Sequence, residues 1–151
     1  MKISKLEYCV NFKYGNDYIG EKHAHPCYEI VYYKSGNGIL SIGSETLVFE
    51  KGMISLAKPN EFHLEKGSKD TEVLYMGFTV EDDNFLLQNG LYNDFNEEIL
   101  RLLEIIYFEF NNKHIYKENV INSLLEVAVY KLLRTTHFED DDRENTINLI
   151  M

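Results

Sequence analysis

Apolar residues recur along the chain with two different periods, and the change of period falls near residue 90. In the first part apolar and polar residues mostly alternate, as at Leu6, Tyr8, Val10 and Phe12, which is typical of a half-buried strand. Further short segments rich in Val, Ile, Tyr and Phe lie between turn sequences, at residues 27–34, 39–42, 46–49, 53–57 and 72–80. Many short strands separated by turns predict a β-sandwich or a small β-barrel.

The apolar pattern after residue 90 is helical. Its first stripe has the i, i+3, i+4, i+7 spacing of one helix face and comprises Ile99, Leu102, Leu103, Ile106 and Phe110. The second stripe, in an expected helix at residues 117–136, comprises Ile121, Leu124, Leu125, Ala128 and Leu132. Because the break between the two helices is short, we expect them to pack as antiparallel neighbours.

Glycine and proline, which mark turns, support the same division. All nine glycines and both prolines lie at or before Gly90, and residues 91–151 contain neither. The sequence therefore predicts a barrel at residues 1–90 and a helical pair at residues 91–138. Residues 139–151 read as an acidic linker followed by the start of another helix, which indicates a longer parent protein.

The two expected helices carry more apolar surface than one stripe requires. Either both helices only cover the barrel, or one face packs on the barrel and another meets a second copy of the chain. We expect the second arrangement and therefore a homodimer. The candidate interface residues are Ile99, Leu102, Leu103, Ile106, Leu124, Leu125, Ala128 and Leu132.

Composition and charge exclude several classes of protein. The chain has 151 residues, of which 44% are hydrophobic, so it is long enough for one domain and apolar enough for a core. A formal net charge of −10 is unfavourable for holding DNA or an anionic membrane directly. No apolar run approaches the roughly 18 residues of a membrane span, and two cysteines cannot form a disulfide framework, which indicates a cytoplasmic protein.

Histidines and a glutamate supply the candidate chemistry. If residues 23–33 are extended, alternate side chains share one face, and His63 adds an imidazole after a later strand. Three imidazoles and a carboxylate (His23, His25, His63 and Glu29) suit a divalent metal such as Zn, Ni, Mn or Fe. Alternatively, the same face lines a ligand pocket that requires no metal. The candidate pocket residues are His23, His25, Glu29, Val31, Tyr33 and His63.

The spacing His-x-His-x3-Glu-x6-Gly, with Pro59 and His63 further on, resembles the cupin β-barrel. Residues 23–63, with Tyr28-Glu29-Ile30, the Gly36-x-Gly38 turn and Gly52 before a strand, resemble the effector-sensing domain of AraC/XylS-type bacterial transcription regulators. This resemblance implies a mainly β fold with C-terminal helices: a cupin-like (double-stranded β-helix, or jelly-roll) barrel and then an antiparallel helix pair. It also implies a small effector, for example a sugar, a homodimer, and DNA binding only through a missing C-terminal helix-turn-helix part.

Departures from the metal-binding cupin enzymes argue against a catalytic metal. Asp17 stands where those enzymes usually have Gly, Glu61 replaces the Gly of their second motif, and Gly67 replaces its Asn. We therefore predict a non-enzymatic sensing and dimerisation domain of a regulator, with no required cofactor. The alternatives are a small metal-dependent cupin enzyme, such as an isomerase or dioxygenase, and a metal-independent sugar-binding cupin.

Overall fold

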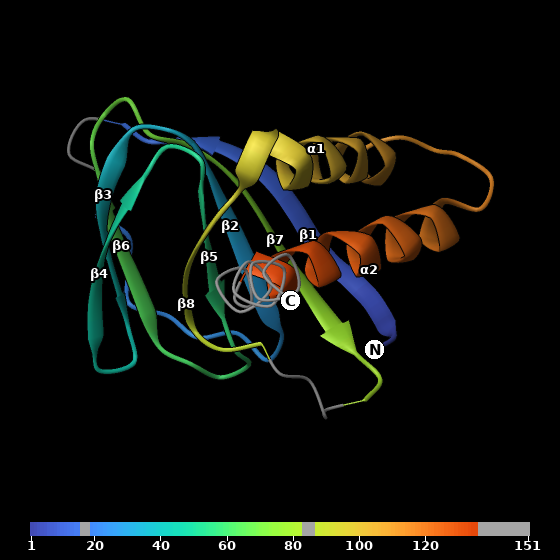
Figure 1. Cartoon of the computed structure of the whole chain (residues 1–151), viewed down its shortest axis with the longest axis horizontal. Helices are drawn as coiled ribbons and strands as arrows, with labels where there is room; N and C mark the ends of the chain where they lie inside the picture. Colours follow the sequence, from blue (N-terminus) through green and yellow to red (C-terminus); the bar gives the residue numbers. More distant parts are fainter. Residues whose placement is uncertain (16–18, 83–86, 136–151) are drawn as a thin grey trace, which may run out of the picture.

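A computed structural model describes residues 1–15, 19–82 and 87–135, and it confirms the mainly β fold with two C-terminal helices. Within these residues the strands come first and the helices follow (Figure 1). The strands are β1 (Ile3–Lys13), β2 (Tyr28–Ser35), β3 (Asn37–Ile42), β4 (Glu45–Glu50), β5 (Met53–Ala57), β6 (His63–Gly67), β7 (Glu72–Val80) and β8 (Gly90–Asn93). The helices are the 3-10 turn η1 (Phe95–Glu97), α1 (Glu98–Phe110) and α2 (Lys117–Thr135).

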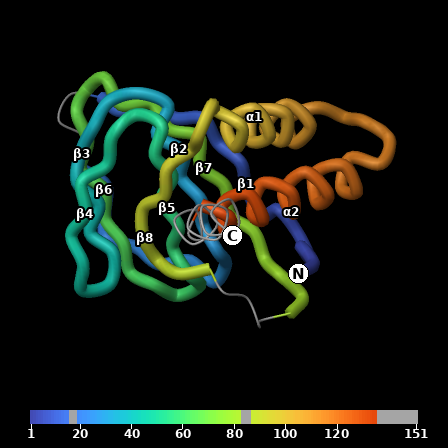
Figure 2. Tube along the Cα trace, in the orientation of Figure 1, coloured from blue at the N-terminus to red at the C-terminus, as the bar shows by residue number. Residues whose placement is uncertain are grey.

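The strands form two antiparallel sheets that enclose a barrel. The larger sheet has the order β1-β7-β2-β5-β8, and the smaller one has the order β4-β3-β6. Isolated bridges from Ile19 to Lys66 and from His23 to His63 join the segment after β1 to β6. Figure 2 shows the smaller sheet at the opposite end of the molecule from the helix pair, so the larger sheet lies between them.

The central strand β2 is buried on both of its faces. Ile30 and Tyr32 pack toward the helices, in a core shared by the larger sheet, α1 and α2. Val31 and Tyr33 point the other way, into a second core between the two sheets. Burial on both faces explains why this segment is an almost continuous apolar run rather than an alternating one.

Strand β1 also has side chains packed on both faces of the larger sheet, and a β-bulge changes which residues lie on which face. The pairing of β1 with β7 shifts between Leu6 and Tyr8, which leaves Glu7 as an extra residue. Leu6 consequently packs in the core under the helices, whereas Tyr8 lines the inside of the barrel. Simple alternation, which places Leu6 and Tyr8 on one face, is therefore wrong at this point.

The structure moves the expected boundary between barrel and helices. Strand β8 pairs with β5 as far as Asn93, so the larger sheet continues beyond residue 90. The helices share one core with this sheet and are not an independent unit. The expected linker at residues 139–151 lies outside the described residues. No helix in the described ranges is long and apolar enough to cross a membrane.

The candidate dimer residues are largely buried within one copy of the chain, which corrects the expected interface. The fully buried ones are Ile99, Leu103, Ile106, Leu125, Ala128 and Leu132. The remaining two, Leu102 and Leu124, are half-buried against the same core. The regular apolar stripes therefore bind the helices to the sheet and to each other. The exposed apolar residues of the helices are others: Ile105, Tyr107, Phe108, Val120, Val127 and Tyr130.

Candidate functional site

The inside of the barrel contains a cavity of about 420 Å³, within the usual range for small-molecule sites. Its floor is built from rows of residues that pair across β1, β7 and β2. One row is Val10, Tyr75 and Val31, and the row beside it is Tyr8, Gly77 and Glu29. The residues that line the cavity are Tyr8, Val10, Phe12, Tyr14, Gly20, His23, His25, Glu29, Val31, Glu65, Val73 and Tyr75.

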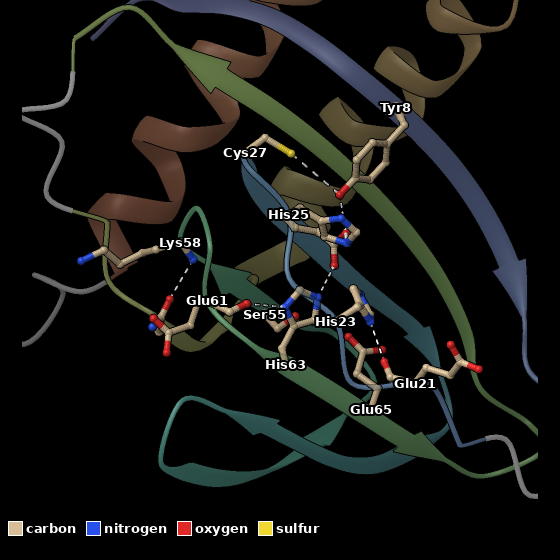
Figure 3. Close-up of polar contacts among 12 residues, drawn as sticks. Tyr8, Glu21, His23, His25, Cys27, Ser55, Lys58, Glu61, His63 and Glu65 are labelled. Carbon is tan, nitrogen blue, oxygen red and sulfur yellow. Dashed lines mark hydrogen bonds and ion pairs between the residues drawn. The ribbon is translucent and has the colours of Figure 1, made fainter.

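Four side chains gather at one part of this cavity, as the sequence spacing predicts. One ligand atom each from His23, His25, Glu29 and His63 lies within 4.8 Å of all the others. Backbone hydrogen bonds between His23 and His63, with N···O distances of 3.1 and 2.9 Å, hold the two segments together. Figure 3 shows the three imidazoles turned toward one another. The set therefore brings three nitrogen donors and a carboxylate to one point.

Backbone carbonyls fix the orientation of two of the imidazoles. His23 Nδ1 lies 2.6 Å from the carbonyl oxygen of Glu21, and His63 Nδ1 lies 3.1 Å from that of Glu61 (Figure 3). A carbonyl only accepts hydrogen bonds, so each Nδ1 carries a hydrogen and Nε2 is directed into the cluster. His63 carries a second hydrogen on Nε2 where it faces the Glu29 carboxylate, and a bound metal would take the place of that hydrogen. Metal-binding histidines are commonly held in this way by an acceptor behind the ring. The residues present thus fit a divalent cation of the Zn, Ni, Mn or Fe type.

Glu29 is the charged centre of the cluster. It accepts hydrogen bonds from the hydroxyl of Tyr8 (2.5 Å) and from Nε2 of His63 (3.1 Å), and His25 Nε2 lies 3.2 Å away. Burial by itself would raise the pKa of Glu29, but the hydrogen bonds from His63 and Tyr8 outweigh it and lower this pKa. Burial would likewise lower the pKa of His63, yet the bond to Glu29 raises it. Glu29 is therefore held as an anion beside imidazoles.

A second tyrosine–glutamate pair lies in the same cavity. The hydroxyl of Tyr14 donates a hydrogen bond to Glu65 (2.5 Å), and Glu65 follows His63 by two residues on β6, on the same strand face. Burial raises the pKa of Glu65 above its ordinary value. Both pairs depend on a glycine, because a Cβ at Gly77 would lie 2.4 Å from the Tyr8 ring and one at Gly67 2.4 Å from the Tyr14 ring.

The candidate pocket residues divide into three groups in the structure. His23, His25, Glu29 and Val31 line the cavity. His63 belongs to the cluster but does not line the cavity, and it is only 3% exposed. Tyr33 is a correction: it is fully buried, stacks on Phe49 with ring centroids 3.9 Å apart, and reaches Ser55 rather than the cavity.

Sequence reasoning missed Tyr14 and Glu65, and it considered Tyr8 only as one of several strand tyrosines that suit a pocket, without a partner or a role. For Glu65 a signal was present, since His63 and Glu65 are two residues apart in a short strand and share a face. For Tyr8 the alternation of β1 identified a strand, but its partner Glu29 lies two strands away across β7. Such a pairing is non-local and follows only from the sheet order.

The fold and the site together define a β-barrel with an internal cavity and a helix pair on one face. Comparison with protein families identifies it more closely: the family described as the AraC-like ligand binding domain matches residues 6–87. The chain therefore belongs to this family. No curated protein sequence matches the chain significantly.

Solved structures show a more distant likeness in the barrel. A predicted oxalate decarboxylase from Thermotoga maritima is 20% identical, with a TM-score of 0.47, over 50% of this chain and 69% of that chain. An RmlC-like cupin from Shewanella frigidimarina is 16% identical, with a TM-score of 0.45, over 51% and 69%. KdgF from a Halomonas species is 22% identical, with a TM-score of 0.42, over 51% and 71%.

Proposed function

We propose that this chain is the effector-sensing and dimerisation domain of an AraC-type transcription regulator. A small molecule binds in the barrel cavity, and the DNA is bound by a separate C-terminal part of the regulator. The domain binds its effector without converting it and requires no cofactor. A cytoplasmic location belongs to the proposal, since both cysteines are free thiols, as is usual in a reducing compartment.

The observation that carries this proposal is that the cavity and the helix pair share the same strands. On β1, Tyr8 faces the cavity, while the backbone N–H of Ile3 donates to the Glu126 carboxylate of α2 (3.1 Å). The N-terminal amine of Met1 also lies 3.1 Å from the hydroxyl of Tyr130 on α2. A ligand that shifts β1 would therefore act on α2 directly, and it would favour one of two states if it binds them with different affinity.

The proposed dimer surface is the outer face of the helix pair. Ile105 on α1 is 48% exposed, and Val127 on α2 is 45% exposed. The Lys131–Glu98 ion pair (3.2 Å) joins α2 to the first turn of α1. An apolar surface on helices that already cover the sheet supports a second copy of the chain as its partner.

A metal-dependent cupin enzyme is a second candidate, and the cluster of His23, His25, Glu29 and His63 favours it. A cation bound there would supply a Lewis acid next to the cavity. In that case the domain would convert its ligand instead of only binding it.

A reporter assay tests the sensing function. Residues 1–151 are joined to a DNA-binding domain that binds its site only as a dimer, and a metabolite library is screened for compounds that change reporter expression. We expect at least one compound to act, and Val31→Phe, which fills the cavity, to abolish the response. Val48→Phe, on the exposed outer face of β4, is the matched control and keeps it. If no compound acts, or if the active compound is chemically converted by the purified chain, the proposed function is wrong.

A further inference from the structure

Several of the hydrogen-bond donors around the cavity are already in use. The hydroxyls of Tyr8 and Tyr14 donate to Glu29 and Glu65. Nδ1 of His23 donates to the carbonyl of Glu21, and Nε2 of His25 faces Glu29. What the wall offers a ligand is therefore mostly acceptors: carboxylate oxygens, phenol oxygens and an imidazole nitrogen.

The cavity also lacks positive side chains. Its described lining contains two glutamates and no Lys or Arg. A carboxylate or phosphate group on a ligand would find no Lys or Arg in this lining and would meet the two glutamates.

Glu65 differs from Glu29 in its surroundings. Glu29 is next to His25 and His63, whereas Glu65 forms no ion pair within the described ranges of the chain. Glu65 accepts a hydrogen bond from the neutral hydroxyl of Tyr14. A partly buried carboxylate without a cation is unfavourable, and a ligand that brings a positive charge reduces that cost.

The cavity that Glu65 lines also suits a cation with an apolar body. The rings of Phe12 and Tyr14 lie 5.8 Å apart, and those of Tyr8 and Tyr75 lie 6.0 Å apart, all at the cavity. Aromatic faces attract ammonium groups, and this attraction is strongest where water is excluded. Valines from β1, β2 and β7 provide the remaining apolar contact.

We propose that the cavity binds a small organic ammonium ion, with its charged nitrogen against Glu65 and its apolar part among the valines and aromatic rings. This inference rests on the ligand-binding role proposed for the cavity, and it replaces the sugar expected from sequence. A sugar presents as many acceptors as donors, and a wall of acceptors satisfies only the donors. The proposed position of the nitrogen also leaves the His/Glu cluster free for a metal.

Matched probes test the proposal by calorimetry on the 151-residue chain in EDTA, which keeps the His/Glu cluster free of metal. One set is benzylammonium, benzyl alcohol and benzoate; a second is isopentylammonium, isopentanol and isovalerate; glucose represents the sugars. We expect the ammonium member of at least one set to bind about tenfold or more tightly than its alcohol, and the carboxylates not to bind. Tighter binding of a carboxylate, an alcohol or glucose, or no ammonium binding at millimolar concentration, would overturn the proposal.

Variants then locate the charge. Glu65→Gln should lower ammonium affinity about tenfold and leave alcohol affinity unchanged, because the isosteric amide removes only the charge. Glu50→Gln makes the same charge change on exposed β4 and should have no effect. If Glu65→Gln does not fold, the ranking of the probes on the unaltered chain decides. An ammonium ion that binds as expected yet leaves the reporter unchanged would contradict the regulatory function and leave this inference standing.

Discussion

The hydroxyl of Tyr8 reaches the carboxylate of Glu29 across an intervening strand, and it does so above Gly77. Tyr8 and Glu29 both pair with Gly77, one from β1 and the other from β2, so neither is the direct neighbour of the other in the sheet. Their 2.5 Å hydrogen bond is possible because no side chain rises from β7 between them. The glycine thus decides the geometry of the anionic centre without touching a ligand.

Gly77→Ala is accordingly expected to destabilise the barrel. The added Cβ would lie 2.4 Å from the Tyr8 ring, and β7 is paired on both sides, so the strain is not easily relieved. We expect a loss of about 1–3 kcal/mol in the free energy of unfolding, measured by urea denaturation. Gly15→Ala, where the new Cβ would meet nothing within 4 Å, is the control and should be close to neutral. Equal effects of the two substitutions would refute this account of Gly77.

Binding of Zn²⁺ to the His/Glu cluster is the second prediction. The purified chain should take up one Zn²⁺ with release of protons, since the imidazoles must bind in their neutral form. A His25→Ala, His63→Ala double variant should lose affinity by much more than about tenfold, because it removes two of four ligands. His114→Ala, an exposed histidine outside the cluster, is the control. Retention of full affinity in the double variant would place the metal elsewhere.

The two cysteines are expected to be unreactive in the folded chain. Burial raises the pKa of Cys9 to about 12, and burial also raises the pKa of Cys27. At pH 8 the thiolate of Cys9 is then populated to about one part in ten thousand, and the thiolate is the reactive form. Ellman's reagent should therefore react slowly with the native chain and rapidly in guanidinium chloride. Fast stoichiometric labelling of the native chain would show that a cysteine is accessible.

The raised pKa of Cys9 makes the free energy of unfolding depend on pH in the alkaline range. The unfolded thiol ionises near its ordinary pKa of 9.0, while the folded thiol of Cys9 keeps its proton to about pH 12. Above about pH 9 the folded state therefore binds more protons, so the contribution of Cys9 is complete below that pH and is lost as pH rises. Comparing the pH slope of the free energy of unfolding in the unaltered chain and in Cys9→Ala isolates this contribution. The variant should have the shallower slope.

Asp94 is expected to stabilise the start of α1. Its two carboxylate oxygens accept hydrogen bonds from the backbone N–H groups of Ile99 and Leu100, both at 3.0 Å, and from the hydroxyl of Tyr32 (2.8 Å). Asp94→Ala leaves these donors without their acceptor and should cost about 1–2 kcal/mol in thermal or urea unfolding. Asp70→Ala, an exposed turn residue, is the comparison. A neutral Asp94→Ala would mean that water replaces the carboxylate.

The outer helix face is expected to hold two copies of the chain together. Ile105→Glu combined with Val127→Glu places charges on this exposed face and should convert a dimer into a monomer in sedimentation experiments. Ile39→Glu, at an exposed apolar site on β3, should leave the dimer unchanged. Dimerisation that survives the helix substitutions and is lost with Ile39→Glu would move the interface to the smaller sheet.

Local spacing was enough to predict part of the site. His23, His25 and Glu29 follow one another along a short segment, and their resemblance to a known motif indicated His63 as well. The Tyr8–Glu29 and Tyr14–Glu65 pairs depend on which strands become neighbours and on the bulge at Glu7, and neither follows from a local period. The apolar stripes of the helices were also predicted correctly. Periodicity shows which helix face is buried, but it does not show whether the same chain or a second copy buries it. Leu103 and Leu125 turned out to be covered by the chain's own sheet.

Strands β1, β2 and β7 carry cavity residues on one face and helix-side core residues on the other. A backbone adjustment that admits a new ligand therefore also disturbs the packing beneath α1 and α2, and selection acts on both effects at once. Strand β6 is under no such double constraint, because its Lys66 faces outward while Glu65 faces the cavity. In the evolution of new ligand preferences, position 65 of β6 is where substitutions can accumulate first, because His63 belongs to the His/Glu cluster and Gly67 is held by the Tyr14 ring. Comparison of related sequences should find position 65 more variable than the cavity positions of β1, β2 and β7.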